Sequence, residues 1–348
     1  MLKVLFRVDG HSTIGLGHLM RCMALSQCLS KHRHEVIFIV SATSLQYCQS
    51  RSDGYGRLLV IPDINKDAEP QWLYRQCLQH DVDWLILDGY QFDQHYRLQL
   101  LSKEFNLGVF DDTNSSGALQ VDLVINGAGN APALNYQNTA PSALLGIGND
   151  YRILRQEFLH LTDRKWSERK CLTLMFGGSD PTNFTLSVLK SLEKVSVTMP
   201  IVMITGAAYP ELLALEQFIE SSELHIQHLH DCQNMAQIMC KTRLAISAAG
   251  GSQFELLSCA TPSMLVVMAE NQRLASQSAA QQGWCQVIDN EVISADELVQ
   301  KSLKLWEQSA LLLKMHERAL VYKTSDGAKR ILNLMQQKTF AKKRISGQ

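Results

Sequence analysis

The first loop of the chain carries the residues whose types and spacing are most suggestive of chemistry. The apolar run Leu2–Val8 predicts a buried strand, and the loop Asp9–His18 (DGHSTIGLGH) leads from it into a helical pattern. Gly15 and Gly17 predict a turn at a helix N-terminus, where backbone N–H groups and the helix dipole favour phosphate or another anion. Because Met20 occupies the position of the third glycine in a dinucleotide fingerprint, the loop does not predict a nicotinamide site.

His18 and Arg21 lie in the first turns of the helix that follows this loop. The helix dipole disfavours the imidazolium form of His18, and a neutral imidazole is what a general base needs near pH 7. A capping or packed histidine is the alternative interpretation. Arg21 could bind phosphate through its guanidinium group, or it could be a surface arginine.

Two glycine loops in the second half of the chain also join a predicted strand to a predicted helix. In Gly177–Thr182 (GGSDPT), the glycines Gly177 and Gly178 allow close backbone approach, and Ser179 or Thr182 could bind phosphate oxygens. Asp180 and Pro181 could instead simply begin the helix.

The second of these loops is Ala248–Ser252 (AAGGS), and Glu255 lies just inside the helix after it. Glu255 could accept both hydroxyls of a ribose, or it could be an ordinary first-turn glutamate. Glu270-Asn271-Gln272 follows the next strand, where exposed amides suit sugar hydroxyls, although Asn271 is also a good N-cap residue.

Acidic residues and histidines also occur at other predicted strands and strand ends. Asp88-Gly89-Tyr90 and Asp111-Asp112 each end a predicted strand, and paired carboxylates can perform acid–base work or simply hold a loop. His225, His228 and His230 cluster on one strand, but no carboxylate or cysteine completes a metal set at recognisable spacing. A metal site is therefore disfavoured.

The elements that must position these residues alternate between strand and helix patterns. Strands are predicted at Leu2–Val8, Glu35–Val40, Trp84–Leu87, Leu107–Phe110, Leu123–Asn126, Leu172–Phe176, Ile201–Thr205, Leu224–Leu229, Leu244–Ser247 and Ser263–Met268. Helices are predicted at His18–Ser30, Thr182–Leu192, Asn234–Cys240 and Gly327–Met335. This alternation predicts two doubly wound α/β domains, joined near Tyr151–Lys170, with ligands at the carboxyl ends of the strands and in the cleft between the domains.

Composition excludes several function classes. The 348 residues carry 33 Lys+Arg against 34 Asp+Glu, so the formal net charge of -1 argues against a nucleic-acid partner. No apolar run approaches the length of a membrane span, and no signal peptide is expected at the N-terminus. The 9 cysteines are odd in number and include no C-x-x-C pair, so buried thiols in a reducing cytoplasm are expected. The basic tail Lys338–Gln348 is expected to be frayed.

With these motifs in view, the chain resembles the UDP-2,4-diacetamido-2,4,6-trideoxy-β-L-altropyranose hydrolases of the pseudaminic acid pathway. The resemblance spans nearly the whole chain, and the opening motif is its most specific part. It is carried by the segments Arg7–Cys22, Asp88–Tyr90 with Asp93, Asp111-Asp112, Asp122–Asn126, Tyr151–Arg155, Phe176–Pro181, Gly250–Glu255, Ala269–Gln272 and Asp326–Ala328.

The resemblance implies the two-domain GT-B fold of the MurG-type glycosyltransferases. It implies Rossmann-like domains at 1–160 and 168–320, a C-terminal helix at 321–337 that packs back on the first domain, and a basic tail at 338–348. It implies release of UDP by water, with inversion at the anomeric carbon, by a monomer that needs no metal or other cofactor. The chain is longer than the shortest family members, but the extra length is too small for a fused acetyltransferase domain. A single activity is therefore expected.

The resemblance also assigns roles to residues of this sequence. It makes His18 the base for the attacking water and places Tyr90 and Asn271 beside the water and the sugar. The implied substrate-binding residues are Gly15, Gly17, Arg21, Gly178, Ser179, Gly251, Ser252, Glu255 and Gln272. Gly89, Gln253 and Phe254 depart from the family pattern and leave the identity of the sugar open. Two alternatives remain, a GT-B glycosyltransferase that uses an acceptor and a nucleotide-sugar-binding protein without catalysis.

Overall fold

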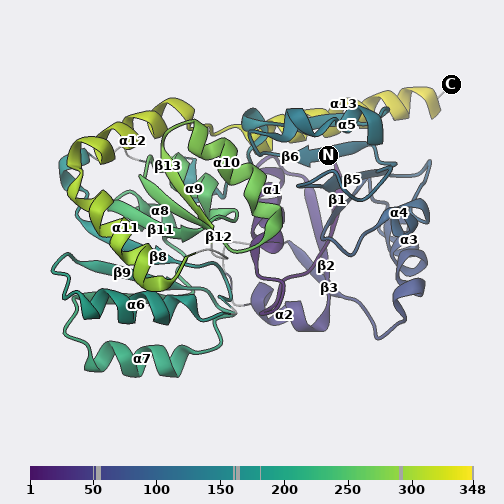
Figure 1. Ribbon diagram of the computed structural model, residues 1–348. Coiled ribbons are helices and arrows are strands. Elements are labelled where there is room, and N and C mark those ends of the chain that lie inside the picture. Colours follow the sequence, from purple (N-terminus) through teal and green to yellow (C-terminus); the bar gives the residue numbers. More distant parts are fainter. Residues whose placement is uncertain are drawn as a thin grey trace. The chain divides into compact units, whose positions relative to one another are not determined.

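The computed structural model describes residues 1–49, 51, 56–159, 161, 165–180, 182–289 and 293–346. They form two compact units, each described by itself below and drawn in Figure 1. Unit 1 consists of Met1–Gly10, His18–Gln156 and Thr324–Gln348, and unit 2 consists of His11–Gly17 and Glu157–Lys323.

Unit 1 is built on a parallel sheet of 7 strands in the order β3-β2-β1-β4-β5-β6-β7. The strands are β1 (Lys3–Val8), β2 (Glu35–Val40), β3 (Arg57–Val60), β4 (Trp84–Asp88), β5 (Asn106–Phe110), β6 (Leu123–Asn126) and β7 (Leu144–Ile147). The strand order reverses between β1 and β4, whose register pairs Val8 with Asp88. Ligands of doubly wound sheets bind at this point, outside the carboxyl ends of the strands.

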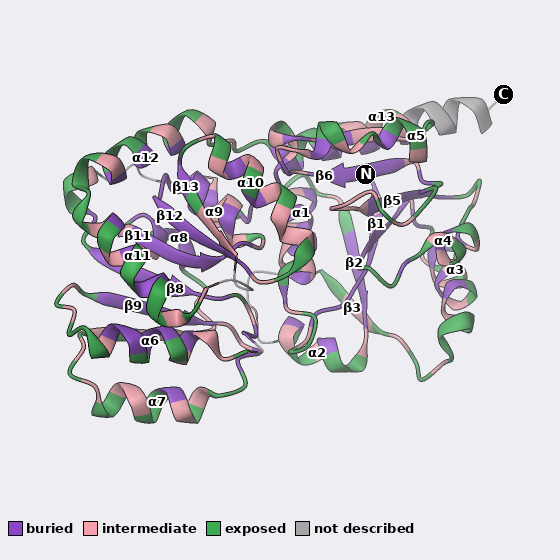
Figure 2. Cartoon of the chain, in the orientation of Figure 1, coloured by how far each residue is buried: buried purple, intermediate pink, exposed green. Residues whose placement is uncertain are grey.

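The helices of unit 1 connect and cover these strands. They are α1 (Gly17–Lys31), α2 (Ala42–Gln49), α3 (Glu69–Gln79), α4 (Gln94–Leu98), α5 (Tyr136–Thr139) and α13 (Gly327–Ser346), with 3-10 helices η1 (Lys66–Ala68), η2 (Ala131–Leu134) and η3 (Asn149–Tyr151). Apolar side chains from the central strands fill the core, so β1, β2 and β4 are almost wholly buried. Figure 2 shows this burial for β1 and β2.

Unit 2 repeats the architecture with a parallel sheet of 6 strands in the order β10-β9-β8-β11-β12-β13. The strands are β8 (Cys171–Met175), β9 (Ile201–Thr205), β10 (Ile226–His230), β11 (Thr242–Ala248), β12 (Ser263–Val267) and β13 (Cys285–Asp289). Here the order reverses between β8 and β11, so the loops that follow these two strands are neighbours.

The helices of unit 2 follow the same alternation. They are α6 (Phe184–Lys194), α7 (Leu212–Ser221), α8 (Met235–Met239), α9 (Ser252–Ser258), α10 (Arg273–Gln281), α11 (Ala295–Glu307) and α12 (Ser309–Tyr322), with 3-10 helices η4 (Gln156–Phe158), η5 (Trp166–Glu168) and η6 (Glu270–Gln272). Side chains of β8, β9, β11, α6 and α11 form one apolar core, in which Leu174, Met203 and Ile246 are fully buried. α11 begins with a complete capping box, in which Ser294 and Glu297 satisfy each other's backbone N–H groups.

The C-terminal helix α13 belongs to unit 1 and is longer than the sequence indicates. We expected a helix over Gly327–Met335 and a frayed tail from Lys338, but the helix continues to Ser346. The tail is ordered at its start because Thr339 is buried and accepts a 2.8 Å hydrogen bond from the indole of Trp84. Lys338 also pairs with Asp122 at 3.2 Å. Gly347 and Gln348 lie outside the described residues.

Two further findings concern the described part of the chain as a whole. None of its helices combines the length and the apolar character needed to cross a membrane. No disulfide bond joins any of its cysteines.

Candidate functional site

His18 and Asp88 form the centre of the candidate site in unit 1. His18 is the second residue of α1 and Asp88 is the last residue of β4, so both lie at the carboxyl edge of the sheet. The imidazole Nδ1 lies 2.6 Å from Oδ1 of Asp88, whose side chain is completely buried. An ionised carboxylate can only accept, so Nδ1 carries the proton and Nε2 is left as an acceptor. That tautomer is the one a general base requires.

Arg21 lies one turn further along α1 and holds the same carboxylate from its other side. Its Nε donates to Oδ2 of Asp88 at 2.6 Å, and its Nη2 donates to Oδ1 at 2.7 Å. Its Nη1 donates to Oδ1 of Asp112 at 2.7 Å, and the guanidinium lies over the ring of Phe110. Burial alone would lower the pKa of Arg21, but Asp112 and Asp88 outweigh it and raise that pKa well above its usual range. Arg21 is therefore an internal clamp and not a surface arginine.

The buried charge of Asp88 is stabilised by this clamp. Burial alone would raise the pKa of Asp88, but Arg21 and His18 together lower it to about 2. Asp88 thus stays ionised at neutral pH and keeps His18 oriented. Cys22 also faces it, with Sγ at 3.4 Å from Oδ2, and burial raises the pKa of that thiol well above its usual range. Cys22 therefore stays a thiol, which excludes it as a nucleophile at neutral pH.

Tyr90 completes the cluster from the loop that follows β4. Its hydroxyl donates to Oδ2 of Asp112 at 3.0 Å. Its ring meets His18 edge-on, with ring centroids 5.3 Å apart and an interplanar angle of 78°. Gly89 precedes it with a φ of +152°, a backbone conformation that glycine adopts without strain. The structure thus brings together three of the residues singled out from the sequence, His18, Arg21 and Tyr90.

A pocket of about 200 Å³ opens beside this cluster and lies wholly within unit 1. Its walls combine apolar side chains with the hydroxyl groups of one loop after β5. The lining residues include His18, Arg21, Gly89, Tyr90, Phe92, Val109, Phe110, Thr113, Ser115, Ser116 and Leu119. The lining thus combines apolar side chains and hydroxyl groups with the charged residues Arg21, Arg97 and Asp111.

Arg97 of α4 fixes the loop that carries these hydroxyl groups. It is buried and donates to four backbone carbonyls, those of Phe92, Ser116, Ala118 and Leu119, and to Oγ of Ser116. Sequence reasoning missed Arg97, because an arginine in a short polar helix looks like a surface residue.

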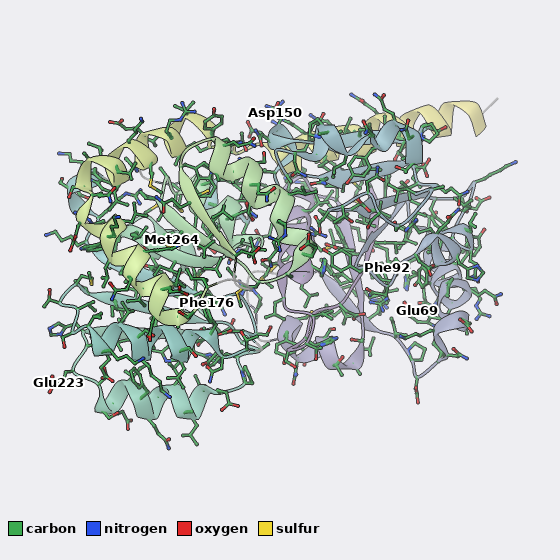
Figure 3. The ribbon with its side chains drawn as sticks, in the orientation of Figure 1. Glu69, Phe92, Asp150, Phe176, Glu223 and Met264 are labelled. Atoms are coloured by element: carbon green, nitrogen blue, oxygen red, sulfur yellow. The ribbon has the colours of Figure 1, made fainter. Side chains whose placement is uncertain are left out.

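A second buried ion network supports the start of the β1–α1 loop. Arg7 on β1 pairs with Asp9 at 2.6 Å and with Glu69 at 2.7 Å, and its guanidinium lies over Phe92. Glu69 and Phe92 lie on the same side of unit 1 in Figure 3. Burial would raise the pKa of Asp9, but Arg7 and the Ser41 backbone outweigh it and lower that pKa. The position of the loop that leads to His18 is thus tied to this network.

In unit 2, the loop His11–Gly17 and the loop after β8 come together. Gly15 has a φ of +79° and donates its N–H to the carbonyl of His11 at 2.8 Å. A Cβ on Gly178 would lie 2.9 Å from the side chain of Leu16. A Cβ on Gly206 would lie 2.5 Å from Cα of Gly178. Both glycines are therefore needed for close packing, whereas Gly17 and Gly251 face open space.

The start of α6 shows what Asp180 does in the loop Gly177–Thr182. Asp180 accepts hydrogen bonds from the backbone N–H groups of Phe184 at 3.0 Å and Thr185 at 2.8 Å. Its carboxylate thus caps the N-terminus of α6 and occupies the first two backbone N–H groups of that helix. Ser179 is buried next to it. Pro181 lies outside the described residues.

The loops after β11 and β12 meet at the same edge of the unit 2 sheet. Gln272 accepts from the backbone N–H of Met268 at 2.9 Å, and a Cβ on Gly250 would lie 3.6 Å from its Nε2. Ser252 and Glu255 lie in the first turn of α9. Asn271 is the middle residue of η6, which excludes the alternative of an N-cap. Gly251, Ser252, Glu255, Asn271 and Gln272 therefore share an edge with Gly178, because β8, β11 and β12 are adjacent strands.

Gln253 supports the glycine loop that follows β11. It is buried and donates to the carbonyl of Ala249 at 2.7 Å, so it holds the glycine loop from beneath. At this position Gln253 therefore contacts the main chain of the loop.

The histidines of β10 have a different environment. Thr205 lies 2.8 Å from Nε2 of His228 and 3.1 Å from Nδ1 of His230 through its hydroxyl. Within the described ranges, no group of three or more His, Cys, Asp or Glu side chains is placed to hold a metal ion.

With the geometry established, comparisons with known proteins define the class of fold. Residues 172–331 match the model of the glycosyltransferase family 28 C-terminal domain. The structure of MurG from Acinetobacter baumannii superposes with a TM-score of 0.68 at 14% identity, over 97% of this chain and 100% of that one. S. aureus MnaA with UDP gives a TM-score of 0.67 at 14% identity, over 96% and 95%. The protein has the GT-B fold, and this prediction is confirmed.

Sequence comparison finds relatives that are 21–26% identical to this chain. The uncharacterized protein MJ1062 of Methanocaldococcus jannaschii is 26% identical over 78% of this chain, which spans only 57% of that protein's length. The spore coat polysaccharide biosynthesis protein SpsG of Bacillus subtilis is 21% identical over 94% of this chain and 96% of its own length. The UDP-2,4-diacetamido-2,4,6-trideoxy-β-L-altropyranose hydrolase of Campylobacter jejuni is 23% identical over 81% and 98%.

Proposed function

We propose that this protein is an enzyme that acts on a nucleotide sugar, and that it hydrolyses UDP-2,4-diacetamido-2,4,6-trideoxy-β-L-altropyranose to UDP and the free sugar. The observation that carries the proposal is the clamp around His18, in which Asp88 receives Nδ1–H and leaves Nε2 as an acceptor. Similarity to a hydrolase of this substrate over 98% of that protein's length supports the choice of reaction.

In the proposed reaction, one water oxygen forms a bond to the anomeric carbon while the bond from that carbon to the diphosphate oxygen breaks. The water proton goes to Nε2 of His18, and the bonding electron pair leaves with UDP. Asp88 stabilises the imidazolium that forms, and Arg21 keeps the carboxylate of Asp88 ionised and in place. Attack from the side opposite to UDP inverts the anomeric configuration.

Unit 2 supplies the residues proposed to bind the nucleotide and the sugar. We assign the diphosphate to the backbone of Gly178, Gly251 and Ser252, with Ser179 supporting the first of these loops from its buried position. Glu255 would accept the ribose hydroxyls, and Asn271 and Gln272 would bind the sugar. From the β1–α1 loop, Gly15 and Gly17 would shape the turn before His18. No step in this scheme needs a metal ion.

The proposal is tested by turnover in water enriched in oxygen-18. The purified protein is incubated with the UDP-amino-sugar alone, without acceptor or metal, and the products are followed by proton NMR and mass spectrometry. Attack of water at the anomeric carbon places oxygen-18 in the free sugar and none in UDP. Inversion at that carbon makes the α-anomer of the sugar appear first. Label in UDP, or a retained anomer, would contradict the proposed mechanism.

A glycosyltransferase is the second candidate function. It is favoured by the match of residues 172–331 to a glycosyltransferase domain, which is the half of the chain that would bind the nucleotide. A transferase would release UDP only when an acceptor is added, whereas the hydrolase releases it in buffer. The same NMR experiment with and without candidate acceptors separates the two. A protein that binds the nucleotide sugar without turning it over in either mixture would be a binding protein only.

A further inference from the structure

Asp112 connects two residues of the candidate site, Arg21 and Tyr90. It lies two residues beyond the end of β5, with its side chain 24% exposed. Its Oδ1 accepts from Nη1 of Arg21 at 2.7 Å, and its Oδ2 accepts from the hydroxyl of Tyr90 at 3.0 Å. Asp112 thereby continues the chain of contacts from His18 through Asp88 and Arg21 to Tyr90.

The direction of the hydrogen bond to Tyr90 follows from the atoms available. An ionised carboxylate has no hydrogen, and a phenol has only one. The hydrogen of Tyr90 is therefore committed to Asp112, and the phenol oxygen meets any further group as an acceptor. Nε2 of His18 is also an acceptor, because its partner nitrogen donates to Asp88. The centroids of the two rings stand 5.3 Å apart, and His18 and Tyr90 both line the same pocket.

We propose that Asp112 is a positioning residue that makes Tyr90 a hydrogen-bond acceptor for the attacking water. A water molecule has two hydrogens, and donation of one to His18 and the other to Tyr90 leaves a lone pair directed away from both. That lone pair is the one that forms the bond to the anomeric carbon. This role rests on the proposed hydrolysis, because it concerns the orientation of water.

Replacement of the Asp112 carboxylate by an amide tests the direction of the hydrogen bond between Asp112 and Tyr90. In Asp112→Asn, the amide oxygen can still accept from Arg21, but the amide NH₂ then faces Tyr90 and donates to it. The hydroxyl hydrogen of Tyr90 is then turned toward the attacking water. Tyr90 therefore donates a hydrogen bond to that water and no longer accepts one from it. Asp112→Asn is therefore expected to be more harmful than Tyr90→Phe, which only removes an acceptor.

Asp122 offers a matched control for this change. Its side chain is 31% exposed, it pairs with one cation, Lys338, and it accepts from one neutral donor, the backbone N–H of Leu107. It immediately precedes β6 and so lies at the N-terminal ends of the parallel strands, whereas the candidate site lies at their carboxyl ends. Asp122→Asn therefore makes the same chemical change in a similar environment and should leave kcat at the wild-type value.

The kinetic experiment compares Asp112→Asn, Tyr90→Phe, the double variant and Asp122→Asn. We expect Asp112→Asn to lower kcat by about 10- to 100-fold with little change in KM, the range for one lost catalytic interaction. The double variant should turn over no more slowly than Asp112→Asn, because the misdirected hydroxyl is gone. A wild-type kcat in Asp112→Asn, or a double variant slower by the product of the two single effects, would overturn the proposal.

A second measurement does not depend on any activity. With tyrosine labelled by carbon-13 at Cζ, the chain gives signals from its 9 tyrosines, and the signal lost in Tyr90→Phe identifies Tyr90. Asp112→Asn should shift that signal and leave the others in place, and Asp122→Asn should shift none at this position. An unmoved Tyr90 signal would overturn the proposal even in an active enzyme. A moved signal in a protein without hydrolase activity would instead mean that the proposed function has failed.

Discussion

Nδ1 of His18 and Oδ1 of Asp88 lie 2.6 Å apart although 70 residues separate them along the chain. Their contact follows from the order of the sheet, in which β1 and β4 are hydrogen-bonded neighbours and both end at the same edge. The fold therefore provides the proposed base together with the carboxylate that orients it. The following predictions test what this arrangement and its supports do.

His18→Ala should retain UDP binding and lose turnover by about 10²- to 10⁴-fold, the usual contribution of a general base. The binding of UDP is measured by calorimetry and the turnover by NMR, with His95→Ala as the control. His95 is a basic residue of α4 that is absent from the residues lining the pocket. Turnover close to that of the wild type would show that His18 is not the base.

Asp88 should make the stability of the protein sensitive to acid. Its pKa in the folded state is about 2, below its ordinary value of 3.8, so its ionised form stabilises the fold above about pH 4. This contribution, about 2 kcal/mol, is lost as the pH falls from about 4 to about 2. Urea unfolding of the wild type and of Asp88→Asn at several pH values measures it. The stability of Asp88→Asn should fall less steeply in this range, and parallel curves would contradict the prediction.

Arg7→Met should destabilise the protein by about 3–5 kcal/mol, because the buried carboxylates of Asp9 and Glu69 lose their cation. Lys3→Met is the control on the same strand. It breaks an ion pair with Asp81, whose side chain is 94% exposed, and should cost less than about 1 kcal/mol. Denaturant unfolding of both variants checks the contrast. Equal losses would mean that the Arg7 network contributes no more than a surface pair.

Alanine substitutions at two glycines of unit 2 should affect the stability of the fold and the binding of UDP differently. Gly206→Ala places a Cβ 2.5 Å from the backbone of Gly178 and should cost about 1–3 kcal/mol, because neither backbone can yield easily. Gly251→Ala meets nothing within 4 Å and should change stability by less than about 0.5 kcal/mol. If the diphosphate approaches this backbone as proposed, Gly251→Ala should nevertheless weaken UDP binding. Thermal unfolding and calorimetry measure the two effects, and unchanged affinity in Gly251→Ala would remove this residue from the site.

Much of the fold could be predicted because its central strands are continuous apolar runs. Glu35–Val40 and Ile201–Thr205 were expected at the bounds observed for β2 and β9. The edge strands β3, β7 and β13 were missed; each is only 4 or 5 residues long, and its residues are mostly half-buried or exposed. An edge strand is defined by pairing with its neighbour, which the local sequence does not show.

The candidate site could be predicted only in part. His18, Arg21 and Tyr90 were singled out from motifs, and the structure brings them together, while their roles stay predictions. The use of Arg21 as a clamp for Asp88 and Asp112 was not foreseen, because it joins a residue of α1 to the ends of two different strands, β4 and β5. Arg7 was likewise missed as a buried ion, since an arginine is usually found at the surface.

Arg97 gives the loop beside the candidate site an unusual tolerance to change. Four of the acceptors that Arg97 contacts are main-chain carbonyls, which every amino acid possesses. The path of residues 116–119 is therefore anchored independently of the side chains that the loop displays. Side chains in this part of the loop could therefore be exchanged without moving its main chain. If the pocket takes part in binding the proposed sugar, a library randomised at Thr113, Ser115 and Ser116 with Arg97 retained should change substrate selectivity.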